Sequence, residues 1–544
     1  MAVGRMAFLY GDFLAIPAAV FNLFSSAKRP VFSVSGAWQD SDIPFEMSRT
    51  HYFTLQNYHK TTDKQSKIRV FCFAHPTSNT NFAETFRDRA VVCYDFGCPG
   101  NSVIVSCGIK LSPSSIRLPT QTVPVCKQYM RVLLVNTSET VGGAAMAANR
   151  LLRALNRNGV EAELLVRDKQ TENPRVIALQ HQRAMKLKFM AERLQIFCNN
   201  GFTRRGLFAV DNGGFGTDIT SLPEFKRADV VHLHWVNQGM LSLKDVKAIV
   251  ESGKRVVWTM HDMWPFTGCC HHAAKCDRWK NGCGNCPLLN KPGNRDLSWQ
   301  TWHAKERAYG KGRIAFVGCS NWLTDLARQS PLLRGCRVES IPNALDATLF
   351  SPASRTEARR RLGLPENGKL ILFVAAKVTN PYKGISYLRD AIGNLCATYP
   401  VLKESLSVVA VGQEADRLKD TFPTPVHAVN YVADPGTMAD YYRAADVLAM
   451  PTLQDNLPNT VAEAMACGIP VVAFEIGGLP QMIDHGENGR LAQYMSTESL
   501  ATNLFSVLTD SQPERFAEAA RRKAVKEYSE QVVANRYRQI YEQP

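Results

Sequence analysis

RVLLVNTSETVGGAAMAANRLLRALN, at residues 131–156, is the clearest indication of the fold in this 544-residue chain. It opens with a continuous apolar run, passes through Gly142 and Gly143, and continues as a helical pattern from position 144. A buried parallel strand is a continuous apolar run, and the helix that follows it covers the sheet. The stretch therefore predicts the first strand, loop and helix of a parallel α/β sheet.

The same unit recurs along the rest of the chain in two series, separated by the break Ile341-Pro342-Asn343. The apolar runs of the first series lie at 163–167, 229–235, 255–259 and 314–318, and those of the second lie at 370–376, 406–412, 446–450 and 470–474. Helical patterns fill the intervals, so each series predicts a doubly wound, Rossmann-like parallel sheet. Ligands bind at the carboxyl ends of the strands in such folds, and we expect them in a cleft between two domains.

The composition is that of a globular protein with an excess of positive charge. Hydrophobic residues make up 45% and charged residues 21%, which excludes a disordered chain, a collagen and a small disulfide-rich scaffold. The 64 Lys and Arg exceed the 49 Asp and Glu, for a net charge of +15. A basic surface attracts nucleic acid, anionic lipid or phosphate-bearing substrates. No run of five like charges occurs, so a nucleic-acid-binding tail has no support.

Two segments bear on where the protein resides. Residues 6–24 resemble a signal or membrane segment, but Asp12 and Pro17 interrupt the apolar run, and the odd total of 15 cysteines argues against a paired secreted framework. We therefore expect a cytoplasmic protein. Residues 185–197 interleave basic and apolar side chains, which is typical of helices that lie on anionic membranes. An ordinary core-facing helix with solvated lysines is the alternative.

The densest chemical signal is DNLPNTVAEAMACGIPVVAFEIGGLPQMI at residues 455–483. Asp455 lies eight positions before Glu463, and a helix is expected to begin near Asn459, so one carboxylate precedes the helix and the other lies within it. Carboxylates accept paired hydrogen bonds from vicinal hydroxyls, which suits a ribose and a second sugar. The pair Gly477-Gly478 permits close backbone approach and precedes a further helix, whose amino end can attract an anion.

With this motif the chain resembles the retaining GT-B glycosyltransferases of family 4, often called group 1, and most specifically those that build bacterial surface polysaccharides. Further agreement comes from the motifs GGAA at 142–145, HDMWPFTG at 261–268, IPNALD at 341–346 and PYKG at 381–384. The resemblance covers about residues 131–544. Family members usually carry Glu at both acidic positions, and Asp455 is a shorter variant at the first.

The resemblance implies a role for each residue of the donor site. Glu463 is expected to hold the ribose of a nucleotide-sugar donor, and Asp455 to bind the transferred sugar with the backbone of Asn456 and Leu457. The cations that neutralise the diphosphate are expected to be Lys383 and Lys377. Positive charge stabilises the departing phosphate, so the chemistry needs no metal ion.

The facing half is expected to contribute Gly142, Gly143 and His261. The glycine pair can bring backbone N–H groups to phosphate or acceptor, although such a pair is often only a turn. His261 follows a buried strand, and the family uses this histidine against the donor sugar; a histidine that caps the next segment is the alternative. His232 and His234 share one strand face and either touch the acceptor or serve the structure.

The resemblance also implies the reaction course. The configuration at the anomeric carbon is expected to be retained by front-face attack, in which the leaving phosphate helps to take the acceptor proton. Double displacement would need a nucleophilic carboxylate, for which Asp262 is the less favoured candidate. A glycosidase mechanism fits poorly, because Asp455 and Glu463 are assigned to recognition.

A cysteine cluster lies between positions 269 and 286, and its closing Cys-x2-Cys is typical of a zinc site. The four candidate ligands are Cys270, Cys276, Cys283 and Cys286. We expect a structural zinc ion that orders the loop beside His261, with free thiols or a disulfide pair as the alternative. A closed four-cysteine site has no open position for catalysis.

The strand pattern and the resemblance divide the chain into four segments. These are an irregular, weakly ordered and non-catalytic N-terminal extension (1–129), an acceptor-side domain (130–342), a nucleotide-sugar donor domain (343–528) and a C-terminal helix that packs across the domain junction (529–544). A third functional domain is the alternative for the extension, which shows no sustained period of 2 or 3.6 residues.

The sequence thus predicts a glycosyltransferase that transfers a sugar from a nucleotide diphosphate to a glycan or lipid-linked acceptor in cell-envelope or exopolysaccharide synthesis. It needs no catalytic cofactor, binds no nucleic acid and resides in the cytoplasm, at times on the anionic inner face of the plasma membrane. Two alternatives stay open. A nucleotide-sugar epimerase would share the architecture, and a zinc-stapled basic protein could bind nucleic acid.

Overall fold

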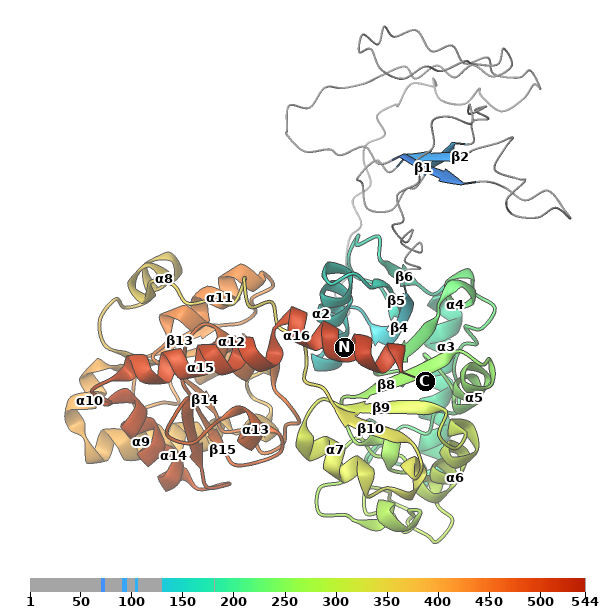
Figure 1. Cartoon of the computed structure of the whole chain (residues 1–544). Helices are drawn as coiled ribbons and strands as arrows, with labels where there is room; N and C mark the ends of the chain where they lie inside the picture. Colours follow the sequence, from blue (N-terminus) through green and yellow to red (C-terminus); the bar gives the residue numbers. More distant parts are fainter. Residues whose placement is uncertain (1–69, 74–90, 95–102, 106–129, 181, 544) are drawn as a thin grey trace, which may run out of the picture. The chain divides into compact units, whose positions relative to one another are not determined.

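The computed structural model describes residues 70–73, 91–94, 103–105, 130–180 and 182–543 (Figure 1). The chain separates into two compact units, Met1–Val125 and Cys126–Pro544. In the first unit the described residues form an antiparallel sheet of β1 (Val70–Phe73), β2 (Val91–Tyr94) and β3 (Val103–Val105), in the order β1-β2-β3. The weak order expected of residues 1–129 concerns segments that lie mostly outside the described residues.

The second unit begins with a seven-stranded sheet in the order β10-β9-β8-β7-β4-β5-β6. All neighbouring strands run parallel. The strands are β4 (Arg131–Ser138), β5 (Glu161–Asp168), β6 (Val176–Ala178), β7 (Val230–Leu233), β8 (Arg255–Met260), β9 (Ile314–Gly318) and β10 (Arg337–Ser340). The first strand of the series, β4, pairs with β5 on one side and β7 on the other, so the chain reverses its winding direction at β4.

Helices cover both faces of this sheet, and their inward residues form two apolar clusters, one on each face. They are α2 (Gly143–Arg157), α3 (Gln182–Asn199), α4 (Pro223–Arg227), α5 (Leu243–Glu251), α6 (Leu297–Tyr309) and α7 (Asn321–Arg328). Capping interactions differ among the first residues of these helices. Ser242 and Asp245 form a reciprocal capping box at α5, whereas α2 follows Gly142 and has no side-chain cap. The amino end of α2 therefore leaves its first N–H groups without side-chain partners.

The second half contains a six-stranded parallel sheet in the order β13-β12-β11-β14-β15-β16. Its strands are β11 (Lys369–Lys377), β12 (Leu406–Gln413), β13 (Val426–Val429), β14 (Val447–Met450), β15 (Val471–Phe474) and β16 (Gly489–Ala492). Its helices are α8 (Arg355–Leu362), α9 (Ile385–Thr398), α10 (Pro400–Ser405), α11 (Pro435–Ala444), α12 (Asn459–Ala466), α13 (Leu479–Met482), α14 (Thr497–Leu508) and α15 (Pro513–Tyr528). Both sheets confirm the predicted pair of doubly wound α/β domains.

The last helix, α16 (Glu530–Glu542), joins the two halves (Figure 1). It follows α15 of the second half and packs against α2 of the first. The Tyr541 hydroxyl is hydrogen-bonded to Nδ1 of His232 on β7 at 2.6 Å, and the Tyr537 hydroxyl to Thr259 on β8 at 2.8 Å. In the part of the chain that the structure describes, no helix combines the length and apolar character needed to cross a membrane.

Candidate functional site

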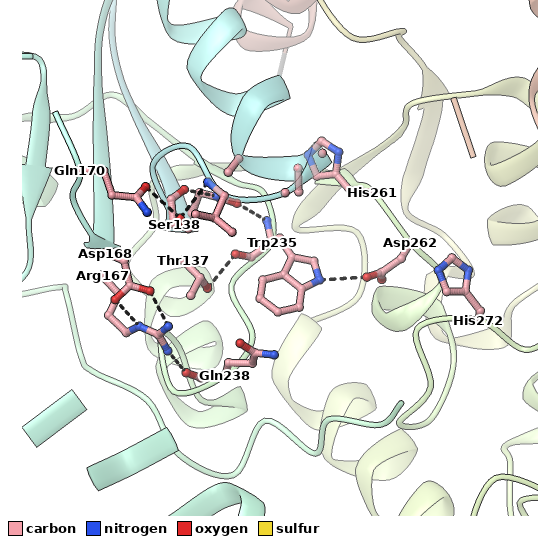
Figure 2. A pocket seen from close by; sticks show the side chains of 16 residues that line it. Thr137, Ser138, Arg167, Asp168, Gln170, Trp235, Gln238, His261, Asp262 and His272 are labelled. Carbon is pink, nitrogen blue, oxygen red and sulfur yellow. Dashed lines mark hydrogen bonds and ion pairs between the residues drawn. The ribbon is translucent and has the colours of Figure 1, made fainter. Parts of the chain in front are cut away.

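A cavity of about 630 Å³ opens at the carboxyl ends of β4, β5, β7 and β8 (Figure 2). It lies in the first half, where the winding direction reverses at β4, as the rule for doubly wound sheets requires. The residues that line it are Asn136, Thr137, Ser138, Val141, Gly142, Gly143, Ala144, Ala145, Arg167, Asp168, Gln170, Trp235, Gln238, His261, Asp262 and His272. The predicted residues Gly142, Gly143 and His261 are among them.

The glycine loop brings main chain to this cavity. Gly142 has φ +94°, a conformation that L side chains rarely adopt, and the positions where a Cβ would stand on Gly142 and Gly143 are open. The uncapped amino end of α2 starts at this point. Unsatisfied N–H groups and the helix dipole make such an end attractive to anions.

Both ring nitrogens of His261 are in contact with other side chains, a second histidine and a cysteine thiol. Its Nε2 is 3.0 Å from Nδ1 of His234, and its Nδ1 is 3.3 Å from Sγ of Cys319. The ring of His234 stacks in turn on His232. Burial lowers the pKa of His261 to about 4 and that of His232 to about 3, and it also lowers the pKa of His234. All three rings are therefore neutral at neutral pH.

Asp262 forms a polar network that sequence reasoning did not find. Its Oδ2 accepts from the indole N–H of Trp235 at 2.9 Å and lies 2.7 Å from Nδ1 of His271, and its Oδ1 accepts from the Trp264 N–H at 2.8 Å. Nε2 of His271 is 2.7 Å from Asp211. Burial opposes the ionisation of Asp262, but the charge and hydrogen bonds of His271 and the Trp264 N–H outweigh it and lower the pKa to about 2.

The signal for these residues was the topology. Trp235 follows β7 and Asp262 follows β8, so both stand at the carboxyl ends of neighbouring parallel strands. Asp262 was already a candidate as the less favoured nucleophile, and the same position could have marked Trp235. Nothing in the spacing of His271 pointed to a partner as distant as Asp211.

Three of the predicted donor residues of the second half, Lys383, Asp455 and Asn456, lie beside His261. Lys383 Nζ is 2.7 Å from Oδ2 of Asp455. The Asn456 amide donates to the main-chain oxygen of His261 at 3.2 Å, and its oxygen accepts from the Ser320 hydroxyl at 2.5 Å. Leu457 is buried. Four of the predicted residues from both halves are thus brought together: His261, Lys383, Asp455 and Asn456.

Glu463 on α12 is engaged by residues of the chain itself. It is only 6% exposed. One carboxylate oxygen pairs with Arg150, which comes from α2 in the other half, and the other accepts from the Tyr442 hydroxyl at 2.6 Å. Both oxygens have partners, so a ribose at Glu463 would have to share or displace them.

Lys377 stands apart from the other predicted cation. It pairs with Glu414 at 2.9 Å, and its side chain is half exposed.

The glycine pair of the acidic motif permits the close backbone approach that the sequence predicts, and the approach is between two loops of the chain itself. A Cβ on Gly477 would lie 2.0 Å from the Asp455 carbonyl oxygen, and one on Gly478 would lie 2.0 Å from that of Asn456. These glycines let two loops touch, and α13, which follows them, is a single turn of four residues.

The cysteine cluster packs in the core beside a buried lysine. Cys269 and Cys286 are both buried in this core, and the described cysteines are free thiols. Among the residues that the structure describes, no three His, Cys, Asp or Glu side chains are placed to hold a metal ion. Zinc binding by Cys270, Cys276, Cys283 and Cys286 stays a prediction.

Lys305 fixes the loop that carries this cluster. The side chain is fully buried, and its ammonium group donates to the carbonyls of Trp264, Gly268 and Thr267, the last two at 2.7 and 3.2 Å. Burial lowers the pKa of Lys305 to about 7. These contacts hold the segment after Asp262 in one conformation.

Comparison with known families assigns both halves. Residues 141–349 match the family described as glycosyltransferase family 4, and residues 368–510 match the family described as glycosyl transferases group 1. The first match contains most of the residues that line the cavity, His261 among them, and the second contains Lys383, Asp455 and Glu463.

Curated relatives match a part of the chain. The D-inositol 3-phosphate glycosyltransferase of Geodermatophilus obscurus is 32% identical over 202 residues, which are 34% of this chain and 42% of the relative. The enzyme of the same name from Thermobispora bispora is 31% identical over 192 residues, or 33% and 44% of the two chains. The chain thus spans less than half the length of these relatives.

Solved structures with the same fold cover most of the chain. Sucrose-phosphate synthase from Thermosynechococcus elongatus is 18% identical with a TM-score of 0.54, over 76% of this chain and 98% of that one. The Anabaena protein HepE in complex with UDP-glucose is 16% identical with a TM-score of 0.51, over 76% and 99%. The matches to glycosyltransferase family 4 and to glycosyl transferases group 1 thus fall on the two parallel-sheet domains, and the likenesses to solved structures show that these domains have the GT-B fold.

Proposed function

We propose that this protein is a glycosyltransferase that moves a sugar, with retention, from a nucleotide diphosphate to a glycan or lipid-linked acceptor in cell-envelope or exopolysaccharide synthesis. One observation carries the proposal. The pair Lys383–Asp455 and the neighbouring Asn456 come from the group 1 half, and Asn456 is bonded to the main chain of His261 at the wall of the cavity. Donor-side and acceptor-side groups therefore meet at the cavity.

The donor chemistry follows from the charges at this point. Cleavage of the anomeric bond leaves negative charge on the diphosphate, and Lys383 with the open amino end of α2 supplies positive potential for it. Preorganised charge of this kind needs no metal ion, so we propose metal-independent catalysis. Lys377 is paired with Glu414 and has at most an auxiliary role.

Front-face transfer fits the state of Asp262 better than double displacement does. The carboxylate already accepts hydrogen bonds from Trp235, Trp264 and His271, and its low pKa makes it a weak nucleophile. In the proposed step the acceptor oxygen bonds to the anomeric carbon as the bond from that carbon to the phosphate oxygen breaks. The acceptor proton passes to the departing phosphate, and a nucleoside diphosphate leaves.

The outer face of α3 supports an acceptor at a membrane. Leu187, Met190 and Leu194 are 66%, 64% and 61% exposed, and their spacing places them on one side of the helix. Exposed Arg183 and Lys186 flank this outer face. Apolar side chains flanked by basic ones bind anionic bilayers. Arg193, which the sequence assigned to the same surface, is instead buried beside Asp211, because that carboxylate pairs with it.

The names of the curated relatives point to a different acceptor, a phosphorylated inositol. Product analysis distinguishes the phosphorylated inositol from the proposed glycan or lipid-linked acceptor. The full chain is incubated with UDP-sugars and GDP-sugars and with three acceptor sets: none, D-inositol 3-phosphate, and polyprenyl-diphosphate-linked sugars. The proposal expects glycosylation of the third set, with the anomeric configuration of the donor retained by NMR. Exclusive glycosylation of the inositol phosphate would replace the proposed acceptor, and isomerisation of the donor alone would indicate the epimerase.

A further inference from the structure

The wall of the cavity described above has no uncommitted cation. Of the described residues that line it, Arg167 is the only lysine or arginine, and it is bound by Asp168 at 2.5 Å and by the main-chain oxygen of Gln238. Burial lowers the pKa of His261 to about 4, so this ring is neutral at neutral pH. Asp168 and Asp262 remain as negative groups. Among the side chains of the wall an anionic ligand would therefore meet more negative than positive charge, and the open amino end of α2 is assigned above to the diphosphate of the donor.

A cation close to the wall is also engaged. Lys383 is bonded to Asp455, and the next residue, Asn456, is bonded to the main chain of His261 at the wall. Lys383 is paired with Asp455 at 2.7 Å and is assigned above to the departing diphosphate of the donor. It is not available to a phosphate on the acceptor.

The other polar groups of the wall are neutral and suit hydroxyls. The Gln170 oxygen accepts from the Thr140 hydroxyl and N–H at 2.7 and 2.9 Å, whereas its amide nitrogen donates to no described residue. The Thr137 hydroxyl is fixed by carbonyl oxygens behind it. Neutral amides and hydroxyls bind uncharged polyols at a smaller desolvation cost than charged groups do.

Trp235 gives the cavity a rigid aromatic face. Its indole N–H donates to Asp262 at 2.9 Å, and its backbone N–H donates to the Asn136 side chain at 2.9 Å. Its ring centre lies 5.7 Å from that of His271. Figure 2 shows Trp235 between Thr137 and Asp262, with the indole nitrogen toward Asp262. A ring with its polar edge bound and part of its surface exposed offers an apolar platform.

We infer that this cavity holds an uncharged sugar ring, the terminal residue of the acceptor, stacked on Trp235, and that it discriminates against rings that carry phosphate. The inference rests on the proposed transferase function and narrows its acceptor. A sugar ring presents C–H groups on one face, which pack on an aromatic platform, and hydroxyls at its rim, which meet Gln170 and Asp168. A phosphate at that rim would lie beside Asp168 without a cation to balance it.

The test is ligand-observed saturation-transfer NMR on the full chain with UDP and GDP present. The probes are methyl glucoside, galactoside and mannoside and the 6-phosphate of each. At least one neutral glycoside should bind about tenfold more tightly than its phosphate. Trp235→Ala should abolish that binding, whereas Trp235→Phe, which keeps an aromatic face, should retain most of it. Equal or tighter binding of the phosphates, or binding that survives Trp235→Ala, would overturn the inference, as would no binding of any neutral glycoside.

A gain-of-function variant keeps the inference testable if Trp235→Ala does not fold. Gln170→Arg adds a cation at the rim, and it should raise the affinity for the glycoside 6-phosphates about tenfold. An unchanged affinity in a folded variant would show that the lack of a cation does not set the preference. Nucleotide binding in the same samples separates the two proposals. If neither UDP nor GDP binds, the transferase function fails; if one binds and phosphorylated rings are preferred, only this inference fails.

Discussion

Glu463 and Arg150 form an ion pair that is buried on both sides and links α12 to α2. Breaking such a pair by removing one partner leaves an uncompensated buried charge. We therefore expect Glu463→Ala to lower the free energy of unfolding by roughly 3–5 kcal/mol. Urea unfolding followed by circular dichroism measures it. Arg360→Ala, which removes an exposed pair with Glu366, is the control and should cost much less.

A second substitution of Glu463 tests the donor site, because glutamine removes the charge and keeps the volume of the side chain. Glu463→Gln keeps a group that can bond Tyr442 but pairs poorly with Arg150 and with ribose hydroxyls. Binding of the preferred nucleotide, measured by calorimetry, should weaken by about 1–3 kcal/mol. An affinity equal to that of the parent protein in a folded Glu463→Gln variant would remove Glu463 from the donor site and leave it as a link between the halves.

Lys383 is expected to serve turnover rather than folding. Its pair with Asp455 is partly exposed, so Lys383→Ala should change stability by less than about 1 kcal/mol. The departing diphosphate would lose its cation, and kcat should fall about 10²- to 10³-fold. Lys377→Ala is the matched control, because Lys377 pairs with Glu414 instead. Equal losses of kcat in both variants would contradict the distinction between these lysines.

At the scale of elements, the strands that sequence reasoning missed are the sheet edges. The apolar runs predicted the inner strands, whereas β6, β10, β13 and β16 lie at the ends of the two sheets. β10 and β13 are half-buried along their whole length. A strand with one neighbour and partial exposure does not need a continuous apolar run, so its sequence lacks the signal that marks a central strand.

The outer face of α3 makes a prediction for the whole element. The triple variant Leu187→Gln, Met190→Gln and Leu194→Gln should reduce binding to vesicles of phosphatidylglycerol and leave the helix folded, since these side chains are exposed. Co-sedimentation measures the bound fraction. Val401→Gln, an exposed apolar residue on α10, should not change it. If the triple variant binds as the parent does, the outer face of α3 is not a membrane surface.

At the scale of the whole molecule, α16 ties the C-terminal end of the chain to the first sheet. Tyr541→Phe removes the hydroxyl that is bonded to the buried His232, so the free energy of unfolding should fall by about 1–3 kcal/mol. Gln539→Ala on the exposed side of α16 is the control. Thermal unfolding compares the two. A Tyr541→Phe variant as stable as the control would show that packing alone holds α16.

The buried histidines should make the protein sensitive to acid. The pKa of His232 is about 3 in the folded state and about 6.5 in an unfolded chain, so between these values only the unfolded state binds the proton. Stability is therefore complete above pH 6.5 and falls as the pH drops. At pH 5 the loss for His232 is about 2 kcal/mol, and the buried His234 acts in the same direction.

Urea midpoints between pH 7 and pH 5 measure this dependence. His232→Gln removes the titrating ring, and its amide can still reach Tyr541 and Thr259, the two partners of the histidine. The slope of stability against pH should decrease by about one proton in this variant. A slope equal to that of the parent protein would show that His232 does not take up a proton on unfolding.

Strand burial and motif spacing are local properties of the chain, and they were enough to predict two doubly wound parallel sheets and to single out the acidic motif and Lys383. The strand at which the winding reverses and the partners of the site residues depend on the tertiary structure. Arg150 pairs with Glu463, which is 313 residues away in the sequence, and His271 bonds both Asp262 and Asp211. Gly477 allows its loop to contact the main chain of Asp455. Such contacts depend on how the layers pack, and no periodicity or spacing along the sequence predicts them.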